Sequence, residues 1–171
     1  MLHRKRLEVK TEILVTLNKK SDFYNKFNNS KINENLSQYI YNESLEGSCK
    51  NKVVINIDSK INISDEEKHD MIDIIRRNYG IMVKDLLYTY EKEQDKKAIL
   101  LVIGIALIIL YYTGFSSVLR EVILMCGWIS ICGSLYGLVF SSTRSYVKIN
   151  RLKNLSNARI YFNFTSVKEK S

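Results

Sequence analysis

Two long apolar runs constrain this chain more than any other feature. They cover residues 98–115 and 122–140, and only the short segment 116–121 separates them. Neither run contains a charged residue. Each is about as long as a helix must be to cross roughly 30 Å of hydrocarbon. We therefore predict a transmembrane hairpin of two helices over residues 98–141, with the rest of the chain held against a bilayer surface.

The charge distribution predicts how this hairpin is oriented. The chain has a net charge of +8, and residues 142–171 hold seven Lys or Arg against one Glu. The segment between the runs carries only Arg120, which Glu121 offsets. Positive residues concentrate on the cytoplasmic side of membrane proteins, and the basic N-terminus lacks the apolar core of a signal peptide. We expect a multi-pass protein of the bacterial cytoplasmic membrane with both termini cytosolic, rather than a nucleic-acid binder with a basic tail.

Three short segments alternate apolar and polar residues, as half-buried strands do. They lie at about residues 12–18, 52–58 and 159–165. Two precede the hairpin and one follows it, and a lone C-terminal strand would leave its apolar face in water. The predicted fold is therefore α+β: a small, mostly antiparallel, three-stranded cytosolic sheet with covering helices. The hairpin is inserted before the last helix and strand, and strand order stays open.

These elements divide the chain into a cytosolic portion (1–97), the hairpin (98–141) and a basic helix and strand (142–171). Helices are expected at 21–27, 36–45 and 143–155. Ser64 and Glu67 form a capping box that opens a long helix from residue 65. The apolar stripe of that helix consists of Met71, Ile75, Tyr79, Met82, Leu86 and Tyr90. We expect the helix to continue into the first span, with a bend near Gly80.

The second apolar run carries a ridge of small residues, which allows helices in a membrane to approach closely. The ridge consists of Cys126, Ser130, Gly133, Ser134, Gly137 and Ser141. One interpretation is packing against the first span of the same chain, where Gly104 and Ala106 offer little bulk. The other is self-association between chains, and the two are compatible.

Two further groups of residues are expected at the membrane surface. Tyr111 and Tyr112 end the first run, where amphipathic rings act as interface anchors rather than as a cofactor site. The basic segment after the second run is expected to contact anionic lipid through Arg144, Lys148, Arg151 and Lys153.

The sequence offers little that suggests catalysis or metal binding. It has no GxSxG, HExxH or glycine-rich phosphate loop, and no Cys/His metal pattern. His69 lies one turn from both Asp65 and Asp73, but a metal needs more ligands, and acidic residues suit a helix N-terminus in any case. We predict no enzyme activity, no catalytic residues, no metal and no cofactor. The spans also lack the ionisable groups of a secondary transporter.

The chain resembles a group of two-span membrane proteins of low-GC Gram-positive bacteria to which no activity is assigned. The resemblance rests on SDFYNKF at 21–27, ISDEEK at 63–68, Gly127-Trp128 and RLKNLSNARI at 151–160. It implies no site or substrate. Two functional hypotheses follow from the residues themselves. The first is a non-enzymatic membrane protein whose cytosolic domain docks a protein partner or senses a signal. The second is a homo-oligomeric, pore-forming or membrane-permeabilising effector of the toxin or defence type.

Overall fold

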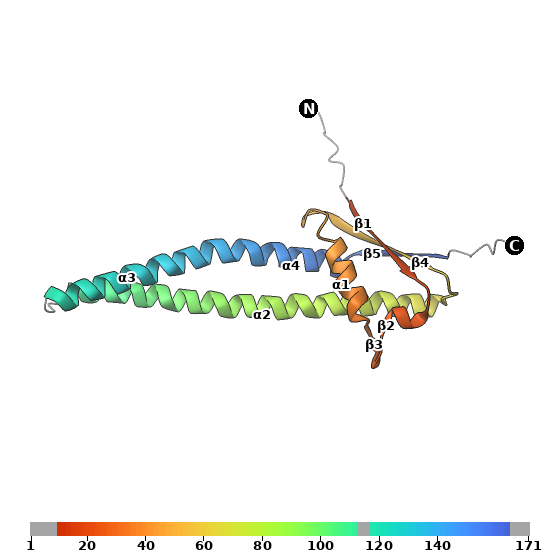
Figure 1. Ribbon diagram of the computed structural model, residues 1–171, viewed down its shortest axis with the longest axis horizontal. Coiled ribbons are helices and arrows are strands. Elements are labelled where there is room, and N and C mark those ends of the chain that lie inside the picture. The colour runs from red at the N-terminus through yellow and green to blue at the C-terminus, as the bar shows by residue number, and fades with distance from the viewer. Residues whose placement is uncertain (1–9, 113–116, 165–171) are drawn as a thin grey trace, which may run out of the picture. The chain divides into compact units, whose positions relative to one another are not determined.

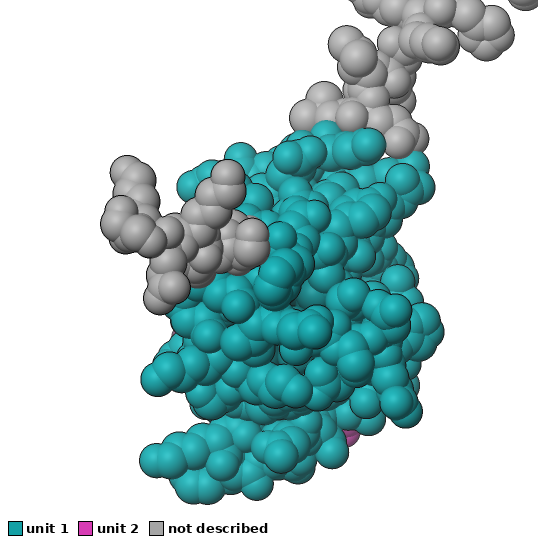
Figure 2. Space-filling model, turned by 90° about the vertical axis from the view of Figure 1, so that its right-hand side faces the viewer, with its two compact units in different colours: residues 1–84, 148–171 teal, residues 85–147 magenta. Residues whose placement is uncertain are grey.

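The computed structural model describes residues 10–112 and 117–164, apart from the side chains of Ser141 and Ser142. The chain forms two compact units. The first, here called the sheet unit, consists of residues 1–84 and 148–171, and the second, the helical unit, of residues 85–147. Figure 2 shows the described part of the sheet unit as one packed body, although two separate segments of the chain build it.

The sheet unit is mixed α+β, with a three-stranded sheet in the order β1-β4-β5 (Figure 1). The strands are β1 (Lys10–Leu17), β4 (Lys52–Ser59) and β5 (Arg159–Phe164). The prediction of three strands at these positions is confirmed. The antiparallel arrangement is wrong, since both pairings are parallel. The physical reason is the length of the connections: a long crossover that contains at least one helix joins each pair of strands, which is the kind of connection that parallel pairing requires.

One face of the sheet forms the core. Ile13 and Ile55 are register partners on β1 and β4, and both are fully buried. Helices α1 (Glu34–Glu43), the first turns of α2 (Asp65–Tyr111) and the last turns of α4 (Ser142–Ser156) lie on this side (Figure 1). The opposite face leaves Leu14 61% and Tyr161 52% exposed. Parallel sheets are usually covered on both faces, so this one has an uncommonly open side.

The connection from β1 to β4 differs from the prediction. Instead of a helix over 21–27, the structure has a 3₁₀ turn η1 (Lys20–Asp22) and a hairpin of β2 (Tyr24–Asn25) and β3 (Asn28–Ile32). Asparagines explain the difference. The Asn25 side chain accepts a hydrogen bond from the Phe27 backbone N–H at 2.9 Å, and Asn28 accepts one from Ser30 at 2.8 Å. Such local bonds offer the backbone a turn in place of a helix.

Helix α2 begins at the predicted capping box. The Ser64 hydroxyl accepts a hydrogen bond from the Glu67 N–H, and the Glu67 carboxylate accepts one from the Ser64 N–H, both at 3.2 Å. Lys20 bonds the same carboxylate at 2.5 Å and holds the pKa of Glu67 below its usual value. The helix runs unbroken through Gly80. Of its predicted stripe, Met71, Ile75 and Tyr79 are fully buried, whereas Met82 is 40% exposed.

Beyond α2 the chain continues as α3 (Ser117–Tyr136), the π-helical turn η2 (Gly137–Ser141) and α4. In the described part of the chain, one helix is long and apolar enough to cross a membrane: Ser117–Ser156, whose most apolar window has a mean hydropathy of 2.0 and is 11% buried. The first apolar run is described only up to Tyr112. At 1.5 Å per residue, that portion alone reaches about 20 Å and is too short to cross the hydrocarbon core.

Tyr79 provides a test of the core. Its hydroxyl donates a 2.8 Å hydrogen bond to the buried Ser37 carbonyl, and burial raises the pKa of Tyr79 to about 12. We expect Tyr79→Phe to cost about 1 kcal/mol at neutral pH, because it removes one buried hydrogen bond. Between pH 10 and 12 the unfolded tyrosine ionises while the folded one stays neutral, so the native protein loses stability over that window. The variant should lose less, which denaturant unfolding at pH 8 and pH 11 would measure; an equal loss in both proteins would contradict the assignment.

Candidate functional site

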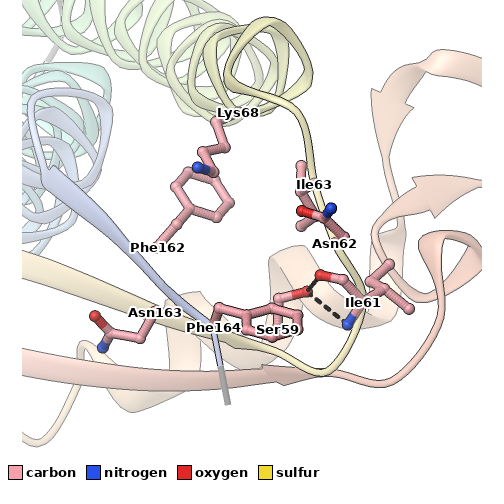
Figure 3. A pocket seen from close by; sticks show the side chains of 8 residues that line it. All are labelled: Ser59, Ile61, Asn62, Ile63, Lys68, Phe162, Asn163 and Phe164. Carbon is pink, nitrogen blue, oxygen red and sulfur yellow. Dashed lines mark hydrogen bonds between the residues drawn. The ribbon is translucent and has the colours of Figure 1, made fainter. Parts of the chain in front are cut away.

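A small cavity of about 70 Å³ lies at the carboxyl edge of the sheet, which is where ligands most often bind in parallel sheets (Figure 3). It lies between the ends of β4 and β5 and the start of α2. The Ser59 hydroxyl donates to the Ile61 carbonyl at 2.7 Å and accepts from the Ile61 N–H at 3.2 Å. Lys68 forms an ion pair with Asp65 at 2.7 Å. Among the described residues that line this cavity, none is a histidine or a carboxylate.

The amino edge of the sheet holds a larger cavity of about 330 Å³. Its lining includes the first residue of each strand, and all three are basic: Lys10, Lys52 and Arg159. The amides of Asn154 and Asn157 add to its polar lining, and none of the described residues that line it is a carboxylate. The arrangement presents positive charge and hydrogen-bond donors around a concave surface, which is the chemistry of an anion site.

Two side chains of α4 fix the loop beside this cavity. The Arg151 guanidinium donates to the carbonyls of Ser44 and Gly47. One turn later, the Asn154 amide donates to the Cys49 carbonyl at 2.7 Å and the Asn51 carbonyl at 3.0 Å. We call these two residues the α4 clamp. They satisfy four carbonyls of the connection between α1 and β4, and thereby position the start of β4 at the cavity.

The clamp changes the interpretation of one predicted lipid ligand. Arg151 is half-buried, and its Nη1 donates to two carbonyls of its own chain, so part of its guanidinium is engaged within the fold; its contact with anionic lipid stays a prediction. The side chains of Arg144, Lys148 and Lys153 are exposed, and their contact with anionic lipid stays a prediction.

Within the helical unit, α3 packs on the C-terminal part of α2 through glycines. A Cβ at Gly104 would lie 3.1 Å from the Gly127 carbonyl oxygen, and a Cβ at Gly127 would lie 3.2 Å from the Gly104 carbonyl oxygen. The backbones therefore approach closely at this point, which only glycine allows. Gly127 is absent from the predicted ridge, although its place in a span rich in small residues could have indicated it.

The residues of the predicted ridge differ in their surroundings. Ser134 is fully buried, and a Cβ at Gly137 would lie 3.2 Å from the Lys97 side chain. By contrast, a Cβ at Gly133 would meet nothing within 4 Å, and Cys126 is exposed. The hydroxyls of Ser130 and Ser134 are satisfied within their own helix, by the carbonyls of Cys126 and Ser130, at 2.8 and 2.6 Å. The side chain of Ser141 lies outside the described residues.

Polar contacts join α2 to α3 and η2 near both ends of the packed segment. The Lys97 ammonium donates to the Gly137 carbonyl at 3.2 Å, where the π-helical turn begins. The Arg120 guanidinium lies 4.7 Å from the centre of the Tyr111 ring and donates to its hydroxyl at 3.3 Å. Tyr111 and Tyr112 pack edge to face, with ring centroids 5.1 Å apart. The two predicted anchor residues thus lie together at the end of α2.

No group of three or more His, Cys, Asp or Glu side chains gathers as a metal site within the described residues. His69 is exposed on α2. All three cysteines are free thiols.

The sequence pattern did not identify the clamp or the amino-edge cavity. Arg151 and Asn154 are three residues apart on one helix face. This spacing is typical of any amphipathic helix, so it does not indicate which groups the two side chains contact. The three strand-initial bases become neighbours only through the parallel register.

The chain was compared with protein-family models, with curated proteins and with solved structures, and none of them matches it. The resemblance drawn from its sequence motifs therefore stays an expectation.

Proposed function

We propose that this chain is a non-enzymatic, membrane-anchored protein whose sheet unit docks a partner or senses a signal on the cytosolic side. One observation carries the proposal. The sheet unit takes β1 and β4 from before the apolar segment and β5 from after it, and both α2 and α4 enter it. An event at the sheet is therefore connected to the apolar segment through two separate helices.

The helical unit supports a two-span arrangement of this segment. Lys97 directly precedes the first apolar run, and its ammonium contacts the carbonyl of Gly137 near the end of the second run. At the other end of the two apolar runs, Arg120 contacts the hydroxyl of Tyr111. These two contacts are about 20–25 Å apart along either helix, at 1.5 Å per residue. Lys97 at one end, and Tyr111 with Arg120 at the other, thus flank an apolar layer, as charged and aromatic groups do in membrane-spanning segments.

Cysteine labelling in intact cells would test this topology. All native cysteines are replaced by serine, and a single cysteine is then restored at position 49 or introduced by Val118→Cys. Since residue 118 lies at the start of α3, in the short segment between the two apolar runs, a membrane-impermeant maleimide should label it in intact cells. Cys49 in the sheet unit should react only after the cells are lysed. Protection of position 118 in cells, together with recovery of the protein in the soluble fraction, would refute the proposed anchor.

A homo-oligomeric pore is the second candidate, and Gly133 favours it. Gly133 faces open space in the monomer, so this part of the ridge is available to another copy. Mass measurement in detergent, with the detergent contribution subtracted, separates the two functions. A monomer or dimer would support the anchored sheet unit, because so few helices cannot enclose a central pore. A closed ring of about five or more copies, with dye release from vesicles that Gly133→Leu abolishes, would support the pore.

A further inference from the structure

The tip of the β2–β3 hairpin projects from the sheet unit (Figure 1) and presents an apolar side chain to water. Phe27 is 91% exposed, more than any other exposed large apolar side chain in the described ranges. Asn25 and Asn28 are register partners on the two strands, so Lys26 and Phe27 form the turn between them. Two-residue turns favour glycine, asparagine and aspartate. Neither the turn nor the core of the sheet unit therefore accounts for an aromatic residue at this position.

The hairpin beneath Phe27 is fixed to the rest of the sheet unit. Phe23 and Ile32, at its two ends, are buried in the core. The Phe23 carbonyl accepts a 2.7 Å hydrogen bond from the Asn33 N–H. From α2, the Arg77 guanidinium donates to the Ser30 carbonyl at 2.6 Å. Because these contacts order the hairpin before any partner binds, they lower the entropic cost of association.

The tip is also positively charged. Lys26 and Lys31 are exposed, and residues 23–32 contain no aspartate or glutamate. The Lys26 ammonium lies 6.0 Å from the centre of the Phe27 ring. In the part of the chain that the structure describes, neither lysine takes part in an ion pair. The tip therefore combines one aromatic ring with two available cations.

We propose that this tip docks a second protein by inserting Phe27 into an apolar pocket that carboxylates surround. An aromatic side chain in a pocket is a common energetic centre of a protein interface, and complementary charge at the rim adds specificity and speeds association. The carboxylates of the partner pair with Lys26 and Lys31. The inference rests on the proposed function, for which it names the docking surface of the sheet unit and the chemistry of the partner.

Two other occupants fit the tip less well. Binding to a membrane surface requires a broad apolar face, and the tip has a single aromatic ring. A second copy of this chain would have to offer an acidic pocket. The two cavities described above have Lys68 or three bases in their linings, which would repel Lys26 and Lys31. A different protein with an acidic pocket therefore suits the tip best.

Photo-cross-linking in living cells tests this surface. Asn29, an exposed residue near Phe27, is replaced in the full-length chain by the photoreactive amino acid p-benzoylphenylalanine, and cells of the native host are irradiated. We expect a discrete adduct with another protein, attached at a surface rich in aspartate and glutamate. Phe27→Ser should lower the adduct yield at least about tenfold, because it removes the central contact. Lys26→Glu/Lys31→Glu should lower it by a similar factor, because it turns attraction into repulsion.

Each tip variant has a matched control elsewhere in the sheet unit. Leu45→Ser removes an apolar side chain that is 52% exposed, and Lys50→Glu/Lys84→Glu reverses the charge of two exposed lysines. Both controls should give the wild-type yield, and circular dichroism of the purified chains establishes that all variants fold. The inference is overturned if no protein adduct forms, or if the controls lower the yield as much as the tip variants do. An adduct only with lipid, or only with a second copy of the chain, also overturns it.

Failure of this inference is distinguishable from failure of the proposed membrane anchor. A protein adduct together with failed cysteine labelling would leave the docking tip standing without the anchor. Successful labelling without an adduct would remove the docking tip and keep the anchor.

Discussion

Replacement of Gly127 by leucine is expected to break the contact between α2 and α3. A Cβ at this position would already lie 2.9 Å from a side-chain carbon of Ile108 and 3.2 Å from the Gly104 carbonyl oxygen. The Gly104 oxygen belongs to backbone and cannot move aside as a flexible side chain does. Overpacking of a well-packed contact costs about 1–3 kcal/mol, and a leucine against backbone should reach about 3 kcal/mol or more.

Gly133→Leu is the matched control, because it makes the same substitution six residues along the same helix at a position with nothing within 4 Å. Thermal unfolding in detergent, followed by circular dichroism, should show a large loss for Gly127→Leu and little change for Gly133→Leu. Equal losses would mean that helix propensity, rather than close packing, causes the effect. A loss confined to Gly133→Leu would instead indicate that α3 packs through its other face, against another copy.

Arg151→Ala is expected to be the most destabilising change in the basic segment after the second run. It leaves the Ser44 and Gly47 carbonyls without the partner that satisfies both. Hydrogen bonds from a charged donor contribute about 1.5–3 kcal/mol, so we expect a loss of about 2–3 kcal/mol. Urea unfolding of the full-length protein in detergent would measure it.

Lys153→Ala removes the same charge from an exposed side chain two residues away and should change stability by less than about 0.5 kcal/mol. Arg151→Lys adds a second comparison. Lysine keeps the charge but has a single nitrogen in place of the planar guanidinium, so it should recover only part of the loss. Full recovery would show that charge alone is needed at position 151. An unaffected Arg151→Ala variant would remove the clamp from the account of the fold.

The two edges of this sheet differ from the usual arrangement in parallel sheets, in which ligands bind at the carboxyl ends of the strands. Here the carboxyl edge has a cavity of about 70 Å³, whose serine hydroxyl is already paired with a neighbouring backbone. The amino edge has the larger cavity and the bases. The α4 clamp borders this edge, since its residue Asn154 lines the cavity.

The local elements of this protein are determined by short stretches of sequence. The three alternating segments became the three strands, and the reciprocal bonds of Ser64 and Glu67 start α2 where the capping box predicts. Periodicity and capping depend on residues within one or two turns, so they can be recognised without a structure. The helix expected over 21–27 was wrong because asparagine turns, equally local, compete with helical periodicity there.

Tertiary structure alone decided the direction of the strands and the neighbours of each site. The alternation of apolar residues in β5 is the same for parallel and antiparallel pairing, and only the long connections through α2 and α4 make the pairing parallel. That register brings Lys10, Lys52 and Arg159, which are far apart in the chain, to one cavity. In the same way, Gly127 differs from Gly133 only by the backbone that packs against it. Sequence determines which surfaces are available, whereas the path of the chain in space determines which of them meet.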